Sequence, residues 1–401
     1  MAVCRNSYQM EPFFPMQPAK RLDNVPMYVF AAHGARLKKL AAEGLDIIRM
    51  DIGEPDAPPP TFIIDELDKQ ARDPKKHGYA GYGGTPELKK AIADYYQRRF
   101  GVKLDPVAET LPLLGSKEGL ANMALAWLDP GDLALVPDPG YPTYQMGAKM
   151  AGAEVYFTPL ERRLGWLPDL EAIPAEVAQR AGLMWISYPN NPTGAVAPFS
   201  FYEEAVAFCR RYDILLCSDM PYADVTFDGY EAPSVLAVPD AKDVALEFNS
   251  LSKSHHMAGW RVGMAVGNAV AVKALLQIKS NVDSGIFRPV QDAATVALNS
   301  DPSWMVARNE EYRRRRDMVL ATVRSIGMAA ETPQAGLYIW AQPPEGYGSQ
   351  EFADKILLET GVSFTAGDAY GPSGVGYIRI SLGTETAKIK EALARLKAMA
   401  L

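Results

Sequence analysis

The sequence predicts an α/β protein with a mostly parallel sheet, followed by a smaller α+β domain. Apolar runs of strand length alternate with helical segments from about residue 55 to residue 290, which is typical of parallel strands joined by helices. Turns rich in glycine, proline and asparagine follow several of these runs, as expected where strands end at one edge of a sheet. The chain has 401 residues, enough for one large and one small domain.

Elements are predicted in order from hydrophobic period and turn residues. The first 25 residues or so are proline-rich and are expected to drape over another part of the protein. Residues 28–43 have helical spacing and stop near Gly44, and Thr85-Pro86 caps a second helix. Further helices are expected up to residue 128 and over 199–211, 303–326 and 386–399. Strands are expected over 45–52, 110–114, 133–136, 182–187, 214–217, 244–248, 262–266, 336–340 and 376–381.

Composition excludes several classes of protein. Hydrophobic residues make up 48% of the chain and charged residues 22%, as in ordinary globular proteins. The net charge of −7 argues against a nucleic-acid-binding surface. The one basic cluster, residues 313–316, shares a helical pattern with Glu310 and Glu311, which indicates a solvated or ion-paired helix face.

The cysteines and the apolar segments bear on location. Cys4, Cys209 and Cys217 lack the spacing of a disulfide framework or a zinc site, which fits a reducing compartment. No window approaches ~18 uninterrupted apolar residues, and the first twenty residues lack a secretory core. We therefore expect a cytoplasmic protein without a membrane segment or a bound metal.

One lysine stands where an ammonium group is costly. Lys253 lies between the apolar runs 244–248 and 262–266, and a buried ammonium costs several kcal/mol unless it is paired or deprotonated. A desolvated lysine has a lowered pKa and can form a Schiff base with an aldehyde. Ser250, Ser252 and Arg261 suit a phosphate group. An aldehyde and a phosphate on one ligand describe pyridoxal phosphate (PLP); the alternative is an ordinary loop lysine near an arginine.

Other candidates also follow predicted strands. Ser116 lies in a glycine turn that opens a helix, where unpaired N–H groups can bind an anion. Tyr141 can stack on a flat ring or belong to the core. Asp219 ends an apolar run and needs a partner, such as a pyridinium N–H, unless it caps the next element. Arg379 lies within an apolar strand and needs a carboxylate from a substrate or from the protein.

In combination, the motifs resemble those of fold-type I PLP-dependent enzymes of the class I/II aminotransferase family. The resemblance runs from residue 51 to Arg379. Its motifs are Asn191-Pro192-Thr193-Gly194, Asp219 with Tyr222, Ser250-Leu251-Ser252-Lys253 and Gly259-Trp260-Arg261-Val262-Gly263. It implies a large PLP-binding domain with a mixed sheet over 55–295, a small domain over 296–401, and an N-terminal segment, 1–54, that contributes to the small domain.

The resemblance also implies a role for each matching residue. Lys253 is the Schiff-base lysine and proton shuttle, and Asp219 keeps the pyridine nitrogen protonated. Asn191 and Tyr222 hydrogen-bond the ring hydroxyl, and Tyr141 stacks on the ring. The phosphate is held by the turn Ser116-Lys117-Glu118 together with Ser250, Ser252 and Arg261. Tyr79 reaches the phosphate of a partner subunit, which implies a homodimer, and Gly53, Asn191 and Arg379 bind the substrate.

The implied reaction moves an amino group from an L-amino acid to a 2-oxo acid. Several strings are most similar to LL-diaminopimelate and aspartate-type aminotransferases. His255-His256 departs from the pattern, and Lys279 and Asn281 lie where relatives read a distal carboxylate. The alternatives are a carbon–sulfur β-lyase or a cyclopropane-forming synthase on the same fold, and a non-catalytic PLP-fold binding protein. The last normally carries an added DNA-binding region, for which the short N-terminus leaves no room.

Overall fold

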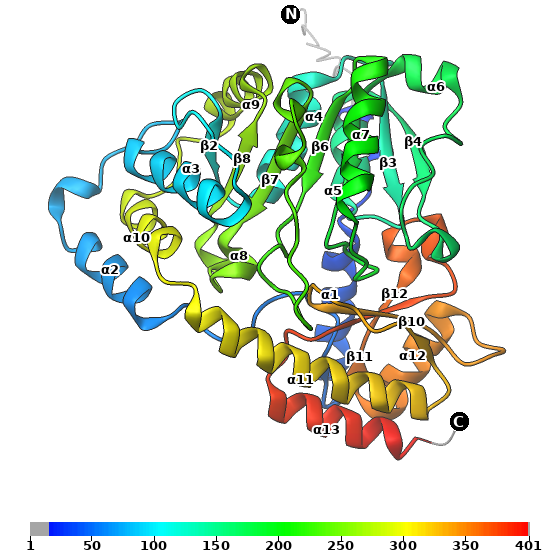
Figure 1. Ribbon diagram of the computed structural model, residues 1–401. Helices are drawn as coiled ribbons and strands as arrows, with labels where there is room; N and C mark the ends of the chain where they lie inside the picture. Colours follow the sequence, from blue (N-terminus) through cyan, green and yellow to red (C-terminus); the bar gives the residue numbers. More distant parts are fainter. Residues whose placement is uncertain (1–15, 400–401) are drawn as a thin grey trace, which may run out of the picture.

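The computed structural model describes residues 16–399, which form a seven-stranded sheet and two smaller sheets (Figure 1). The strand order of the large sheet is β2-β8-β7-β6-β5-β3-β4. Its strands are β2 (Thr110–Leu113), β3 (Leu133–Asp138), β4 (Glu154–Pro159), β5 (Ala181–Ile186), β6 (Leu215–Asp219), β7 (Ala245–Ser250) and β8 (Gly263–Gly267). Neighbouring strands are parallel except where β8 pairs with β2 and β7. The predicted α/β class with a mostly parallel mixed sheet is confirmed.

Helices cover both faces of this sheet. Successive residues of β5 belong to different cores, since Met184 packs into one buried cluster and Trp185 into the other. A strand buried on both faces reads as a continuous apolar run, which explains why β5 was predictable. The α-helices up to residue 299 are α1 (Val29–Ala42), α2 (Thr61–Ala71), α3 (Pro86–Phe100), α4 (Ser116–Trp127), α5 (Thr143–Ala151), α6 (Ala175–Arg180), α7 (Phe199–Tyr212), α8 (Leu251–Ser254), α9 (Ala269–Val282) and α10 (Arg288–Asn299).

The C-terminal part is built on a small antiparallel sheet with the order β12-β13-β10-β9. Its elements are β9 (Ala329–Ala330), β10 (Tyr338–Gln342), β12 (Thr365–Ala366), β13 (Ile378–Ser381), α11 (Ser303–Ser325), α12 (Ser349–Thr360) and α13 (Thr386–Lys397). The N-terminal β1 (Ile48–Arg49) pairs in parallel with β11 (Val362–Ser363). Figure 1 shows α11 running below the large sheet toward this part, with α13 beside it. The domain boundaries at residues 54 and 295 stay predictions.

Several finer predictions can be compared with the structure. The strand expected over 45–52 is reduced to β1, because the chain turns away at Asp51 toward the small sheet. The ion-paired helix face over 313–316 is confirmed, since Arg315 pairs with Asp56 and Arg316 with Asp228. Within residues 16–399 no helix is both long and apolar enough to cross a membrane. Cys4 and most of the proline-rich N-terminal segment lie outside the described residues.

Two glycines that end helices offer a matched test of the join between β1 and β11. Gly361 after α12 and Gly101 after α3 both have φ of +72°. An alanine there adopts a left-handed conformation that costs about 1–2 kcal/mol. A Cβ at Gly101 meets nothing within 4 Å, whereas one at Gly361 overlaps the Asp46 carbonyl oxygen beside β1.

We therefore expect Gly101→Ala to lower the free energy of unfolding by about 1–2 kcal/mol. Gly361→Ala adds a steric clash and should lower it by at least about twice as much. Denaturant unfolding of the two variants checks this expectation. Equal destabilisation would show that the approach of β1 to the end of α12 imposes no constraint.

Candidate active site

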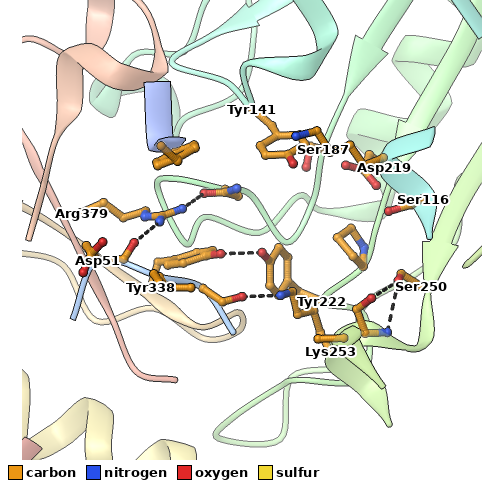
Figure 2. A pocket seen from close by; sticks show the side chains of 18 of the residues that line it. Asp51, Ser116, Tyr141, Ser187, Asp219, Tyr222, Ser250, Lys253, Tyr338 and Arg379 are labelled. Carbon is orange, nitrogen blue, oxygen red and sulfur yellow. Dashed lines mark hydrogen bonds between the residues drawn. The ribbon is translucent and has the colours of Figure 1, made fainter. Parts of the chain in front are cut away.

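A cavity of about 360 Å³ lies where the C-terminal ends of the large-sheet strands face the small sheet (Figure 2). Its lining comes from segments far apart in the sequence. Twelve predicted site residues line it: Gly53, Ser116, Lys117, Tyr141, Asn191, Asp219, Tyr222, Ser250, Ser252, Lys253, Arg261 and Arg379. Figure 2 shows Lys253 and Asp219 on the large-sheet side and Arg379 with Asp51 on the other.

Other predicted residues lie elsewhere. The Tyr79 side chain is 91% exposed and does not line the cavity. The Glu118 carboxylate accepts a hydrogen bond from Asn122 at 2.7 Å instead of facing the cavity. Lys279, considered for a distal substrate carboxylate, is buried and paired with Asp283 at 2.7 Å, and Asn281 donates to a carbonyl of its own helix. The structure therefore gives neither residue access to this cavity.

Lys253 lies in α8, the single turn between β7 and the chain that returns to β8. Its Nζ donates to the Gly53 carbonyl oxygen, and among residues 16–399 it makes no ion pair within 4 Å. Burial lowers the pKa of the Lys253 amine to about 8, although the Glu54 carboxylate opposes that change. A larger fraction of the amine is therefore neutral and nucleophilic near neutral pH than in an exposed lysine.

Asp219 ends β6 with one carboxylate oxygen paired and the other free. Oδ2 accepts a hydrogen bond from the Tyr144 hydroxyl at 2.7 Å, and the Tyr144 ring stacks on Trp185 with the ring centres 5.1 Å apart. Oδ1 is buried without a partner in the described chain. Burial raises the pKa of Asp219 to about 7. A buried unpaired acceptor is costly, so this oxygen calls for a donor from a ligand, and a pyridinium N–H fits it.

A third corner of the cavity suits an anion. Helix α4 starts at Ser116 without a side-chain cap, so its first N–H groups are open. Gly115 has φ of +76°, and a Cβ there would overlap the Arg261 guanidinium that lies beside the helix start. Ser250 Oγ donates to Ser252 Oγ at 2.9 Å on the facing turn. Open amides, hydroxyls and a guanidinium together match a phosphate.

Arg379 supplies a buried cation on the opposite side. Its Nη1 donates to Asn191 Oδ1 at 2.8 Å and its Nη2 to the Asp51 carbonyl at 2.6 Å. Nε is buried without a partner, and no carboxylate lies within 4 Å of the guanidinium in the described chain. The guanidinium carbon lies 4.1–5.5 Å from the centres of three rings, those of Tyr338, Tyr370 and Phe30. Such a site favours a carboxylate from a ligand.

Sequence reasoning missed several lining residues. Tyr144 lies three residues after Tyr141 on the first turn of α5, and helical spacing was the signal that could have found it. Tyr338 hydrogen-bonds the Tyr222 hydroxyl at 2.7 Å, and alternation in the strand 336–340 places it on one face with Trp340. Tyr28 reaches the Tyr141 hydroxyl at 3.3 Å from before α1, for which the sequence offers no signal.

The chain was compared with known proteins. The aminotransferase class I and II family model matches residues 46–396. LL-diaminopimelate aminotransferases from Dehalococcoides mccartyi and Moorella thermoacetica are each 47% identical, over 95% of this chain and 98% of theirs. Among solved structures, substrate-bound BacF from Bacillus subtilis is 37% identical with a TM-score of 0.91, over 97% of this chain and 99% of its own. Thermus thermophilus aspartate aminotransferase with maleate is 29% identical with a TM-score of 0.88, over 95% and 98%.

Proposed function

Because this chain belongs to the class I and II aminotransferases, which use PLP, we propose that it moves an amino group between LL-diaminopimelate and a 2-oxo acid. The aminotransferase activity follows from the family, and its substrates are an amino acid and a 2-oxo acid. The choice of LL-diaminopimelate is supported by relatives of that name at 47% identity. The same relatives do not favour a β-lyase or a cyclopropane-forming synthase.

The observation that carries the proposal is the Arg379 guanidinium, which has no carboxylate within 4 Å in the described chain and lies across the cavity from the Lys253 amine. An amino acid presents a carboxylate and an amine on one carbon. The guanidinium attracts the carboxylate, and the site holds the amine near Lys253. Asn191 Oδ1 accepts a hydrogen bond from the Arg379 guanidinium, so Asn191 can contact the same carboxylate. The main chain at Gly53 also lines the cavity and can contact that carboxylate. We assign the α-carboxylate to these three residues.

The cofactor's polar groups find matching partners. Lys253 would hold its aldehyde covalently, Asp219 Oδ1 would accept the ring N–H, and Tyr222 and Asn191 would donate to the ring hydroxyl. Tyr141 is placed to stack on the ring. The phosphate would lie at the start of α4, held by backbone N–H groups of Ser116, Lys117 and Glu118 and by Ser250, Ser252 and Arg261.

When bound, PLP supplies a ring that withdraws electrons from the substrate carbon. The Lys253 amine, when not bonded to the cofactor, would take the proton from that carbon and deliver it to the cofactor rather than back to the same carbon. A pKa of about 8 suits both transfers near neutral pH. Asp219 would place its negative charge against the ring nitrogen, while the Tyr144 hydroxyl holds its other oxygen in place. Burial of both groups strengthens their electrostatic interactions.

We further propose a homodimer. Tyr79 is exposed in a single chain, and an exposed tyrosine in a glycine-rich loop is suited to reach the phosphate of a second copy. Tyr82 and Phe287 are also exposed, at 51% and 45%.

The free, buried thiols of Cys209 and Cys217 support a cytoplasmic location. A PLP-binding domain over 55–295 and a small domain over 296–401 remain part of this proposal.

Substrate choice can be measured with the purified holoenzyme. We expect faster transfer from LL-diaminopimelate than from aspartate or alanine, with formation of the new amino acid from a 2-oxo acid as readout. Lys253→Ala should abolish transfer because it removes the amine proposed to bond the cofactor aldehyde and to move the proton. Faster transfer from aspartate or alanine would reject LL-diaminopimelate as the preferred amino donor, but it would leave the family assignment unchanged. Pyruvate and ammonia released from a cystathionine-like substrate would instead indicate a β-lyase.

Arg379→Ala tests the carboxylate site. A charged hydrogen-bond pair is worth about 1.5–3 kcal/mol, so the KM of the amino donor should rise by about 10–100-fold. Arg379→Lys keeps the positive charge but loses the planar fork of the guanidinium. Its KM for the amino donor should therefore lie between those of the wild-type enzyme and Arg379→Ala. The amount of bound cofactor, measured by absorption, serves as the control and should stay constant. A KM within two-fold of wild type would remove Arg379 from substrate binding.

A further inference from the structure

One face of α11 rests on the turn that follows Lys253. Trp304, Arg308 and Tyr312 are spaced four residues apart, so they lie on the same side of the helix. The Trp304 ring packs against His255 with the centres 5.8 Å apart, and the Tyr312 hydroxyl lies 3.3 Å from His256 Nε2. The two histidines that depart from the family pattern therefore contact α11 rather than the cavity.

Arg308 makes the central contact of this face. Its Nη1 donates to the Ser254 carbonyl oxygen and its Nη2 to the Asp224 carbonyl oxygen. Nε donates to Asn309 Oδ1 at 3.1 Å. The side chain is buried, and within residues 16–399 it forms no ion pair within 4 Å. All of its hydrogen-bond acceptors are thus neutral, and two of them belong to the main chain of different segments.

These two segments carry the proposed catalytic groups. Ser254 directly follows Lys253 and is the last residue of α8, the turn after β7. Asp224 comes two residues after Tyr222 and five after Asp219, in the loop that follows the neighbouring strand β6. The Asp224 carboxylate is itself fixed by the Tyr95 hydroxyl at 2.7 Å and by Arg99 Nε at 3.0 Å. The Arg308 guanidinium therefore ties the Lys253 turn to an anchored loop.

We propose that Arg308 is a positioning residue that sets where the Lys253 amine stands relative to Asp219 and Tyr222. This inference rests on the proposed role of Lys253. A planar fork with fixed donor directions can hold two carbonyl groups at a defined separation, whereas an ammonium is a single point charge. Proton transfer is sensitive to small displacements, because the amine must reach the substrate carbon within hydrogen-bond range.

The same helix provides a matched control. Arg316 lies two turns further along α11, is also buried, and pairs with Asp228 and the Pro333 carbonyl, away from the Lys253 turn. Both Arg308→Met and Arg316→Met remove a buried guanidinium from α11. Only the first frees the segment that bears Lys253, so the pair separates loss of stability from loss of position.

The experiment compares the holoenzyme variants by kcat, KM, melting temperature and the pH midpoint of the bound cofactor's absorption. For Arg308→Met we expect kcat to fall at least 10-fold with KM within about three-fold, and the midpoint to move up by at least half a pH unit. The midpoint rises because burial holds the pKa of the Lys253 amine down, and a displaced turn lets water reach that nitrogen. Arg316→Met should lower the melting temperature but leave kcat within two-fold and the midpoint in place.

Arg308→Lys keeps the test decisive if Arg308→Met does not fold. Lysine can reach one carbonyl but not both, so kcat should lie between wild type and the Met variant. Wild-type kcat and midpoint in Arg308→Lys, or equal behaviour of Arg308→Met and Arg316→Met, would overturn the proposal. Turnover by the wild-type and Arg316→Met enzymes separately checks the proposed function.

Discussion

The structure depends on keeping the Lys253 amine away from water without giving it a carboxylate partner. Its hydrogen bond goes to the neutral Gly53 carbonyl, and burial outweighs the opposing Glu54 carboxylate, so the pKa falls to about 8. Asp219 shows the opposite shift for the same reason, with one buried oxygen left unpaired. Asp219 Oδ1 and the Nε of Arg379 are both buried without a partner in the described chain. Packing of the large sheet against the small one maintains that arrangement, because it holds the three groups in fixed positions around one cavity.

Much of the fold was predictable because the parallel strands are buried on both faces. The run 182–187 is apolar up to its last residue, Ser187, and corresponds to β5, while the predicted helix 28–43 corresponds to α1, Val29–Ala42. The edge strand β4 was not predicted, since its first four residues are exposed or half-buried and its pattern mixes polar and apolar types. The antiparallel direction of β8 could not be predicted from the sequence either. Strand order and direction depend on contacts between distant segments, as in the pairing of β8 with β2.

The candidate site was likewise predictable from local sequence in part, while contacts between distant segments were not. Residues just after predicted strands, such as Asp219, Asn191 and Lys253, line the cavity because parallel strands deliver their ends to one edge. Residues that contact these side chains from other segments were not predicted. Tyr144 is the clearest case, since its hydroxyl donates a hydrogen bond to Asp219 from α5, the helix that follows β3. Lys279 shows the reverse. A lysine suggested a substrate contact, but its ammonium lies 3.6 Å from Glu118 and pairs with Asp283 inside the protein.

The most direct test of this account is the pKa of the Lys253 amine in protein stripped of its cofactor. The rate of absorption change after adding PLP reports the neutral amine, and Lys253→Ala should remove this signal. Because burial lowers the pKa, the neutral fraction should already rise as the pH passes about 8. A midpoint near 8 would support the account. A midpoint near the 10.5 of an exposed lysine would contradict it, since the amine would then be a solvated ammonium at neutral pH.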